Sequence, residues 1–320
     1  MNAPFALKPS VTVRASSLAE LFDCPARWEA KHLLRMRMPS SGAARLGTAI
    51  HAGTALFDQA KLDGNPLTPS EAAGALIDTL YAKDDEQGNG EVEWGDTKPQ
   101  DAETIGLTLH SRYCHEIAPK QDYVGVEVPC EALEITDLGL VLTGTTDRIY
   151  RNVDGELGIA DLKSGARAVG SDGIAVTTGH GPQMGVYELI AEFAVGQALT
   201  APAQIIGLNT GKTAASQKVG VGLIGNAREA LIGDEDSPGL LQHASHIIHS
   251  GLFYGNPKSV LCSAKYCPRH GSGGDARQPA CGCRSRQEDQ GRRQAPCRRA
   301  GLVTDCRCLG TGWHPGRDPG

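Results

Sequence analysis

The sequence predicts an α/β protein with a mixed central β-sheet flanked by helices and an N-terminal helical layer. Three observations lead to this fold class: helix-forming segments fill the first third of the chain, β-rich segments joined by short turns follow, and helical and strand segments then alternate. At 320 residues the chain can bury a substantial core in one or two domains.

The N-terminal layer is predicted to contain four helices. Ser17 and Glu20 form a capping-box pattern in front of an apolar-periodic stretch. A second capping-box pattern, from Thr68 to Glu71, has a proline at the first helical position. The helices are expected at residues 17–32, 46–61, 69–83 and 100–117, with a polar, Gly-rich loop at 84–99.

The middle of the chain is predicted to form an antiparallel meander of three strands. Its last two strands are separated by a turn that contains Asp154 and Gly155, a strong hairpin signal. The strands are expected at residues 121–136, 140–150 and 156–163. A loop at 165–181, a helix at 182–196, strands at 204–209 and 218–224, and a helical segment at 226–250 that is interrupted at 233–239 complete the predicted body.

The predicted hairpin brings acidic side chains together. Because side chains alternate along a strand, Asp161 and Lys163 share one face while Leu162 points to the other. Asp147, on the partner strand, is then expected beside Asp161. Two carboxylates at close range raise each other's pKa unless a cation lies between them, and Mg²⁺ prefers carboxylate, water and phosphate oxygens. For Asp-x-Lys alone, a solvated hairpin face is the alternative interpretation.

Five short motifs occur in a fixed order along the chain: Gly47–His51, a strand with Glu127, Gly144–Asp147, Asp161–Lys163 and Gln183–Tyr187. In these motifs the sequence resembles the PD-(D/E)XK nucleases of the RecB type over residues 16–267. The resemblance implies a restriction-endonuclease-like core, with a nuclease domain at residues 1–267.

The resemblance also implies an activity. The expected function is a Mg²⁺- or Mn²⁺-dependent deoxyribonuclease, and the family resemblance favours an exonuclease. It is expected to act on DNA in recombination, repair or phage DNA processing, with a helicase or recombination protein as a partner. The alternative is a catalytically inactive DNA-binding or accessory protein of the same fold.

Roles for individual residues follow from the same resemblance. The implied metal ligands are His51, Asp147, Asp161 and the backbone carbonyl of Leu162, and the implied catalytic residues are Asp147, Asp161 and Lys163. Glu127 is expected as a weak or outer ligand, and Gln183 and Tyr187 as residues that touch DNA or brace the metal ligands. Two of these residues have an alternative interpretation without a role at the site. His51 is then a partly buried polar residue, and Tyr187 is a core residue.

Three cysteines form a further candidate site. Cys24, Cys262 and Cys267 resemble three of the four ligands of the four-iron, four-sulfur cluster in RecB-type relatives such as the iron–sulfur CRISPR adaptation nucleases. A cluster needs four ligands, and residues 269–273 contain no cysteine where the fourth is expected. The alternatives are a buried thiol at Cys24 and a zinc site of Cys262, Cys267, His270 and Cys281 or Cys283.

Residues 268–320 differ sharply in composition from the rest of the chain. These 53 residues include ten Arg, ten Gly and five of the ten cysteines, but no Lys. Because few large apolar residues are present, the segment is predicted to be disordered. A reading-frame change in the gene is one hypothesis for this composition, which resequencing would test, and a basic nucleic-acid-binding tail is the alternative.

The formal charge of −6 argues against a globally basic surface for nucleic acid. A local path for a phosphate backbone is instead predicted at Arg27, Lys31, Arg35, Arg37 and Arg45. The chain has no 18-residue apolar run and no N-terminal signal pattern, which favours a cytoplasmic protein without a membrane contact.

Overall fold

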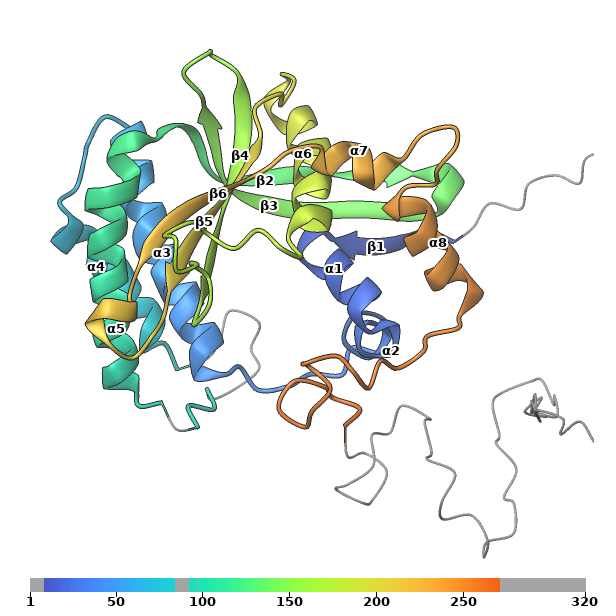
Figure 1. Ribbon diagram of the computed structural model, residues 1–320, viewed down its shortest axis with the longest axis horizontal. Coiled ribbons are helices and arrows are strands. Elements are labelled where there is room, and N and C mark those ends of the chain that lie inside the picture. The colour runs from blue at the N-terminus through green and yellow to red at the C-terminus, as the bar shows by residue number, and fades with distance from the viewer. Residues whose placement is uncertain (1–8, 84–91, 96, 271–320) are drawn as a thin grey trace, which may run out of the picture. The chain divides into compact units, whose positions relative to one another are not determined.

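The computed structural model describes residues 9–83, 92–95 and 97–270 (Figure 1). The chain divides into two units, Met1–Cys283 and Arg284–Gly320, and all described residues belong to the first. Most of the predicted tail at 268–320, and most of the predicted loop at 84–99, lie outside the described residues. None of the described helices is long and apolar enough to cross a membrane.

A six-stranded mixed sheet forms the centre of the described part, as predicted. β3 pairs antiparallel with β2 and β4 and parallel with β1, whereas β5 pairs parallel with β4 and antiparallel with β6. The predicted meander corresponds to β2, β3 and β4. The strands are β1 Val11–Arg14, β2 Asp122–Ile135, β3 Leu140–Arg151, β4 Leu157–Gly165, β5 Ala203–Asn209 and β6 Val219–Ile224.

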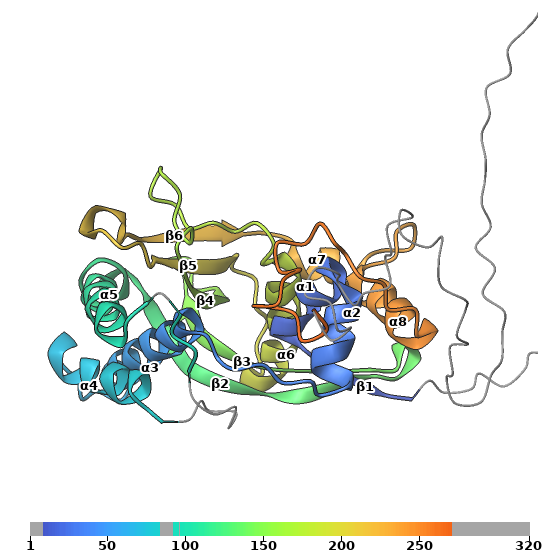
Figure 2. The ribbon, with the colours of Figure 1, turned by 90° about the horizontal axis from the view of Figure 1, so that it is seen from below.

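Helices cover both faces of the sheet. In both views α3, α4 and α5 lie together on one side, and α1, α2, α7 and α8 lie on the other (Figure 1, Figure 2). The helices are α1 Ala15–Asp23, α2 Pro25–Trp28, α3 Gly42–Leu62, α4 Pro69–Leu80, α5 Pro99–Arg112, α6 Gly181–Val195, α7 Ala227–Ile232 and α8 Leu240–Ser250, with short helical turns η1 Glu29–Leu33, η2 Tyr113–Ile117, η3 Ala118–Lys120, η4 Thr136–Leu138 and η5 Ala214–Ser216.

The two helical layers correspond to two hydrophobic cores. Neighbouring residues of β5 show the separation, because side chains alternate between the faces of a strand. Ile205 packs in the core that contains Leu18 of α1, and Ile206 packs in the core that contains Ile50 of α3. The sheet is therefore buried on both faces, and α3 crosses the face on which the candidate site lies.

The beginning of the chain differs from the prediction of one helix at residues 17–32. β1 precedes α1, and Pro25, which has no N–H to donate, starts a separate short helix. The predicted capping box is wrong: α1 begins at Ala15, and Ser17 donates its hydroxyl hydrogen to the carbonyl of Arg14. Glu20 instead accepts from Lys31.

The helix that carries His51 is longer than predicted. α3 begins one turn earlier, because the hydroxyl of Ser41 caps it by accepting from the N–H of Ala44 at 3.2 Å. His51 therefore lies near the middle of α3 and not in its first turns. The capping box of α4 is confirmed, since Thr68 and Glu71 make both of its hydrogen bonds.

Candidate metal centre

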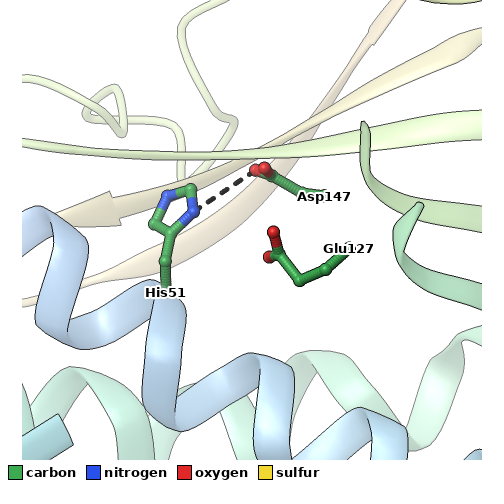
Figure 3. A group of neighbouring side chains, drawn as sticks. All are labelled: His51, Glu127 and Asp147. Atoms are coloured by element: carbon green, nitrogen blue, oxygen red, sulfur yellow. Dashed lines mark ion pairs between the residues drawn. The ribbon is translucent and has the colours of Figure 1, made fainter. Parts of the chain in front are cut away.

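Three side chains from three different elements converge at one point. His51 comes from α3, Glu127 from β2 and Asp147 from β3, and one ligand atom of each lies within 4.8 Å of the others (Figure 3). Imidazole nitrogen and carboxylate oxygen are ligands that divalent cations accept. Within residues 9–83, 92–95 and 97–270 no other such group of His, Cys, Asp and Glu forms, so these three residues fit a divalent cation best.

A split in the sheet creates the place for Asp147. One edge of β3 pairs with β1 as far as Thr143 and with β4 from Arg148 onward, so Asp147 lies between the two partners. β4 leaves β3 beyond Ala160 and continues beside β5. The N–H of Leu162 then donates to Asp147 Oδ2 at 2.7 Å instead of to a ladder carbonyl.

His51 contacts the same stretch of β4. Its Nε2 lies 3.0 Å from the carbonyl oxygen of Leu162, and its Nδ1 lies 3.5 Å from Asp147 Oδ2. A carbonyl oxygen can only accept, so the contact favours the tautomer that carries the proton on Nε2. The lone pair of Nδ1 then faces the carboxylates.

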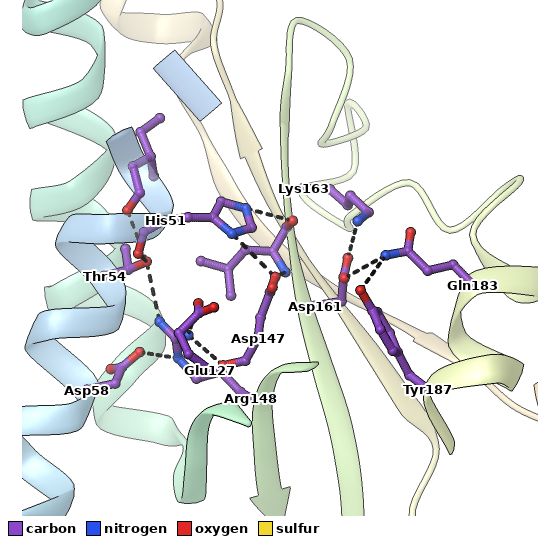
Figure 4. A network of polar contacts seen from close by, with 12 residues as sticks. His51, Thr54, Asp58, Glu127, Asp147, Arg148, Asp161, Lys163, Gln183 and Tyr187 are labelled. Carbon is purple, nitrogen blue, oxygen red and sulfur yellow. Dashed lines mark hydrogen bonds and ion pairs between the residues drawn. The ribbon is translucent and has the colours of Figure 1, made fainter. Parts of the chain in front are cut away.

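Asp161 and Lys163 form an ion pair next to this cluster. Lys163 Nζ lies 2.5 Å from Asp161 Oδ2, and the Asp161 side chain is almost fully buried (Figure 4). Burial and the charge of Asp147 raise the pKa of Asp161 to about 6, although Lys163 opposes the rise. Asp161 is not one of the three converging ligands, but it lies close enough for the charge of Asp147 to act on it.

Gln183 and Tyr187 lie one turn apart on α6, and Gln183 links Tyr187 to Asp161. The amide of Gln183 donates to Asp161 Oδ1 at 3.2 Å and to the hydroxyl oxygen of Tyr187 at 3.3 Å. Both residues are more than nine-tenths buried. Tyr187 also packs in the hydrophobic core, as in the alternative interpretation, and a role of both residues in bracing metal ligands stays a prediction.

The glycines of the motifs allow close approaches. A Cβ at Gly144 would lie 2.7 Å from the ring of Tyr187, so glycine lets α6 pack its aromatic side chain onto β3. A Cβ at Gly47 would lie 2.7 Å from the hydroxyl of Ser164, so glycine lets α3 approach β4 one turn before His51.

Glu127 has an unusual backbone conformation. Its φ of 47° lies in the left-handed region, which L-residues other than Asn and Asp seldom adopt inside a strand. Partial burial and the charge of Asp147 raise the pKa of the Glu127 carboxyl group. Strained backbone of this kind concentrates at functional sites. The structure brings Glu127 into the converging group, whereas the sequence indicated only a weak or outer ligand.

A buried ion pair behind the cluster was not identified from the sequence. Arg148 has no exposed surface, and its Nε lies 2.7 Å from Asp58 Oδ2 on α3. Tyr113 donates to the same oxygen at 2.5 Å. The available signal was the spacing of Asp58, seven residues after His51 and so two turns along the same face of one helix.

The three candidate iron–sulfur ligands lie in one region, but their sulfur atoms do not all lie within 4.8 Å of one another. Cys24 and Cys267 are buried, and burial together with the charges of Cys267 and Cys24 raises the pKa of Cys262. The backbone of Asn256 donates to Cys24 Sγ at 3.4 Å, which ties the two ends of the described chain together. The described residues supply three thiols here, and the zinc alternative requires Cys281 or Cys283, which lie outside them.

The predicted path for a phosphate backbone is wrong at two of its five positions. Arg27 and Arg45 are buried; Arg27 pairs with Glu20 at 2.9 Å, and Arg45 donates to the carbonyl of Thr79 at 3.0 Å. Lys31 also pairs with Glu20. The spacing of positive charges indicated an exposed helix face. In the structure, the side chains of Arg27 and Arg45 instead contact carboxylate and carbonyl groups of the protein.

Comparisons with known proteins give a family match and one similar solved structure. A family model described as "PD-(D/E)XK nuclease superfamily" matches residues 12–271. One solved structure, described as "Crystal structure of SSO0001", is similar at 12% sequence identity and a TM-score of 0.36, with 82% of this chain and 85% of that chain covered. The sequence matches no curated protein at a significant level.

Proposed function

Because this chain belongs to the PD-(D/E)XK nuclease superfamily, we propose that it is a nuclease that hydrolyses phosphodiester bonds of DNA with the help of Mg²⁺ or Mn²⁺. The single observation that carries the proposal is the convergence of His51, Glu127 and Asp147 within 4.8 Å, with an Asp–Lys ion pair beside them. When bound, a divalent cation supplies positive charge that neutralises phosphate and acidifies water.

The residues of the chain divide into those that hold the cation and those that act on the phosphate. His51, Glu127 and Asp147 are the proposed ligands, and Asp161 completes the site from β4. The Leu162 carbonyl, expected from the sequence as a further ligand, instead contacts His51 Nε2 at 3.0 Å. Asp147 also orients β4, because it accepts from the N–H of Leu162.

Lys163 is the proposed catalytic lysine. Its side chain is about one quarter exposed, and Asp161 holds its ammonium group at the edge of the cluster. A positive charge at that position can stabilise negative charge that develops on the phosphate. Gln183 fixes Asp161 and thereby the resting position of the lysine.

We propose an exonuclease that acts on DNA ends in recombination, repair or phage DNA processing, with a helicase or recombination protein as partner. The order of the five motifs supports this part of the proposal. A four-iron cluster is not included, because the described residues supply only three thiols where four ligands are needed. Iron analysis of the anaerobically purified chain tests that point directly.

A cleavage assay tests the proposed function. End-labelled linear DNA and covalently closed circular DNA, each single- and double-stranded, are incubated with Mg²⁺, Mn²⁺ or EDTA. We expect cleavage of linear DNA that EDTA abolishes, with closed circles resistant. Asp147→Asn and Lys163→Ala should lower the rate at least about 100-fold.

Asp154→Asn, in the exposed turn between β3 and β4, is the matched control and should cleave as the wild type does. DNA binding without cleavage by the folded wild type would favour the inactive accessory protein instead. Equal cleavage by the wild type, Asp147→Asn and Lys163→Ala would overturn the assignment of the site.

A further inference from the structure

Arg148 is a fully buried charge immediately behind the metal centre. It follows Asp147 in β3, and Asp58 on α3 and the ring of Tyr123 surround it, with the guanidinium carbon 5.7 Å from the ring centroid. Buried ion pairs are weak evidence for stability, because apolar residues of similar size often replace them without loss. The pair therefore calls for a role other than holding the core together.

The guanidinium group contacts all three segments that carry the converging ligands (Figure 4). Nη1 lies 3.4 Å from Glu127 Oε1 and donates to the carbonyl of Asp147 at 2.7 Å. Nη2 donates to the hydroxyl of Thr54 at 3.4 Å, and that hydroxyl in turn donates to the carbonyl of His51 at 3.0 Å. One rigid, planar group thus joins α3, β2 and β3 at the site.

Among the three converging side chains, that of Glu127 is the most exposed to water. Its side chain is 46% exposed, so water competes for the carboxylate, and its backbone holds a strained left-handed conformation. Arg148 provides a fixed positive charge 3.4 Å from this carboxylate. Asp58 provides the counter-charge that allows Arg148 to stay buried and aligned.

We propose that Arg148, held by Asp58, is a positioning residue that presets Glu127 and thereby sets the affinity of the centre for its divalent cation. The proposal rests on the proposed function, in which Glu127 is a cation ligand. Lysine in place of arginine keeps the charge but lacks the planar fork, so it cannot reach Asp58, Thr54 and Glu127 together.

Titration of the full-length protein with Mn²⁺ alone, by calorimetry or electron paramagnetic resonance, tests the proposal. Arg148→Lys should weaken Mn²⁺ binding about 10- to 100-fold, as loss of groups that orient metal ligands usually does. Arg112→Lys, at the end of α5 in a surface ion pair with Glu116, is the matched control and should bind as the wild type does.

A double-mutant cycle separates positioning from general structural damage. If Arg148 acts through Glu127, adding Arg148→Lys to Glu127→Gln should cause little further loss of Mn²⁺ affinity, whereas independent effects would multiply. Tyr113→Phe removes only the hydroxyl that donates to Asp58 and serves as a milder variant if Arg148→Lys does not fold. It should weaken Mn²⁺ binding about threefold.

The outcomes distinguish this inference from the proposed function. If the wild type cleaves DNA and a folded Arg148→Lys variant binds Mn²⁺ like the wild type, the inference alone is overturned. If Arg148→Lys does not fold, an unchanged Mn²⁺ affinity in a folded Tyr113→Phe variant overturns it in the same way. A wild type that binds Mn²⁺ in an Arg148-dependent way but cleaves no DNA overturns the proposed function alone.

Discussion

His51 Nε2 lies 3.0 Å from the carbonyl oxygen of Leu162, a residue 111 positions later in the chain. The contact joins α3 to the point at which β4 separates from β3. The two nitrogens of the ring therefore have different partners, since Nε2 contacts β4 while Nδ1 faces Asp147. The two nitrogens can therefore be tested separately.

Substitutions at His51 should affect cation binding unequally. An asparagine amide oxygen takes approximately the place of Nδ1, whereas a glutamine amide nitrogen takes that of Nε2. We expect His51→Asn to bind Mn²⁺ more tightly than His51→Gln, with both weaker than the wild type by about tenfold or more. His115→Gln, on an exposed helical turn, is the control. A reversed order, measured by calorimetry, would place the ligand nitrogen at Nε2.

Gln183→Ala should slow cleavage without a large loss of stability. The variant leaves Asp161 with Lys163 but removes the amide that holds Asp161 Oδ1. We expect kcat to fall about 10- to 100-fold while KM for DNA changes little. Gln242→Ala, exposed on α8, is the matched control. A rise in KM with unchanged kcat would mean that Gln183 binds DNA instead.

The local arrangement of β3 and β4 could be predicted from the sequence. Strand alternation and the Asp154-Gly155 turn placed Asp147 next to Asp161, and the observed ladder ends one pair earlier, at Arg148 and Ala160. These features depend on neighbouring residues and turn chemistry, which a sequence shows directly.

Features that depend on distant contacts could not be predicted. β1 is four residues long and exists because it pairs with β3, more than 120 residues away. The left-handed conformation that turns Glu127 into the site leaves no sequence signal, because glutamate does not favour it. The burial of Arg148 depends on Asp58, an acidic partner 90 positions away that only the folded chain brings close.

Gly144→Ala should destabilise the protein by about 1–3 kcal/mol, because an added methyl group would lie 2.7 Å from the rigid ring of Tyr187. Gly74→Ala is the matched control. Gly74 is exposed in α4 and has open space around it, so alanine there should stabilise by about 0.5–1 kcal/mol. Urea unfolding measures both. An equal stability change in the two variants would contradict the close contact between β3 and α6.

Glu20 should make the stability of the N-terminal helices depend on pH. Partial burial would raise the pKa of Glu20, but the hydrogen bond from His32 and the charge of Lys31 outweigh it and lower the pKa to about 2 from an ordinary value of 4.5. A depressed carboxyl pKa contributes stability that is complete above about pH 4.5 and is lost as the pH falls toward 2.

Glu20→Gln removes this contribution. The difference in unfolding free energy between the wild type and the variant should therefore be largest near neutral pH and should shrink between about pH 5 and about pH 3. Other carboxylates titrate in both proteins and cancel in the difference, so urea unfolding at several pH values isolates Glu20. A difference that stays constant over this range would show that Glu20 holds Arg27 and Lys31 by contact and not by charge.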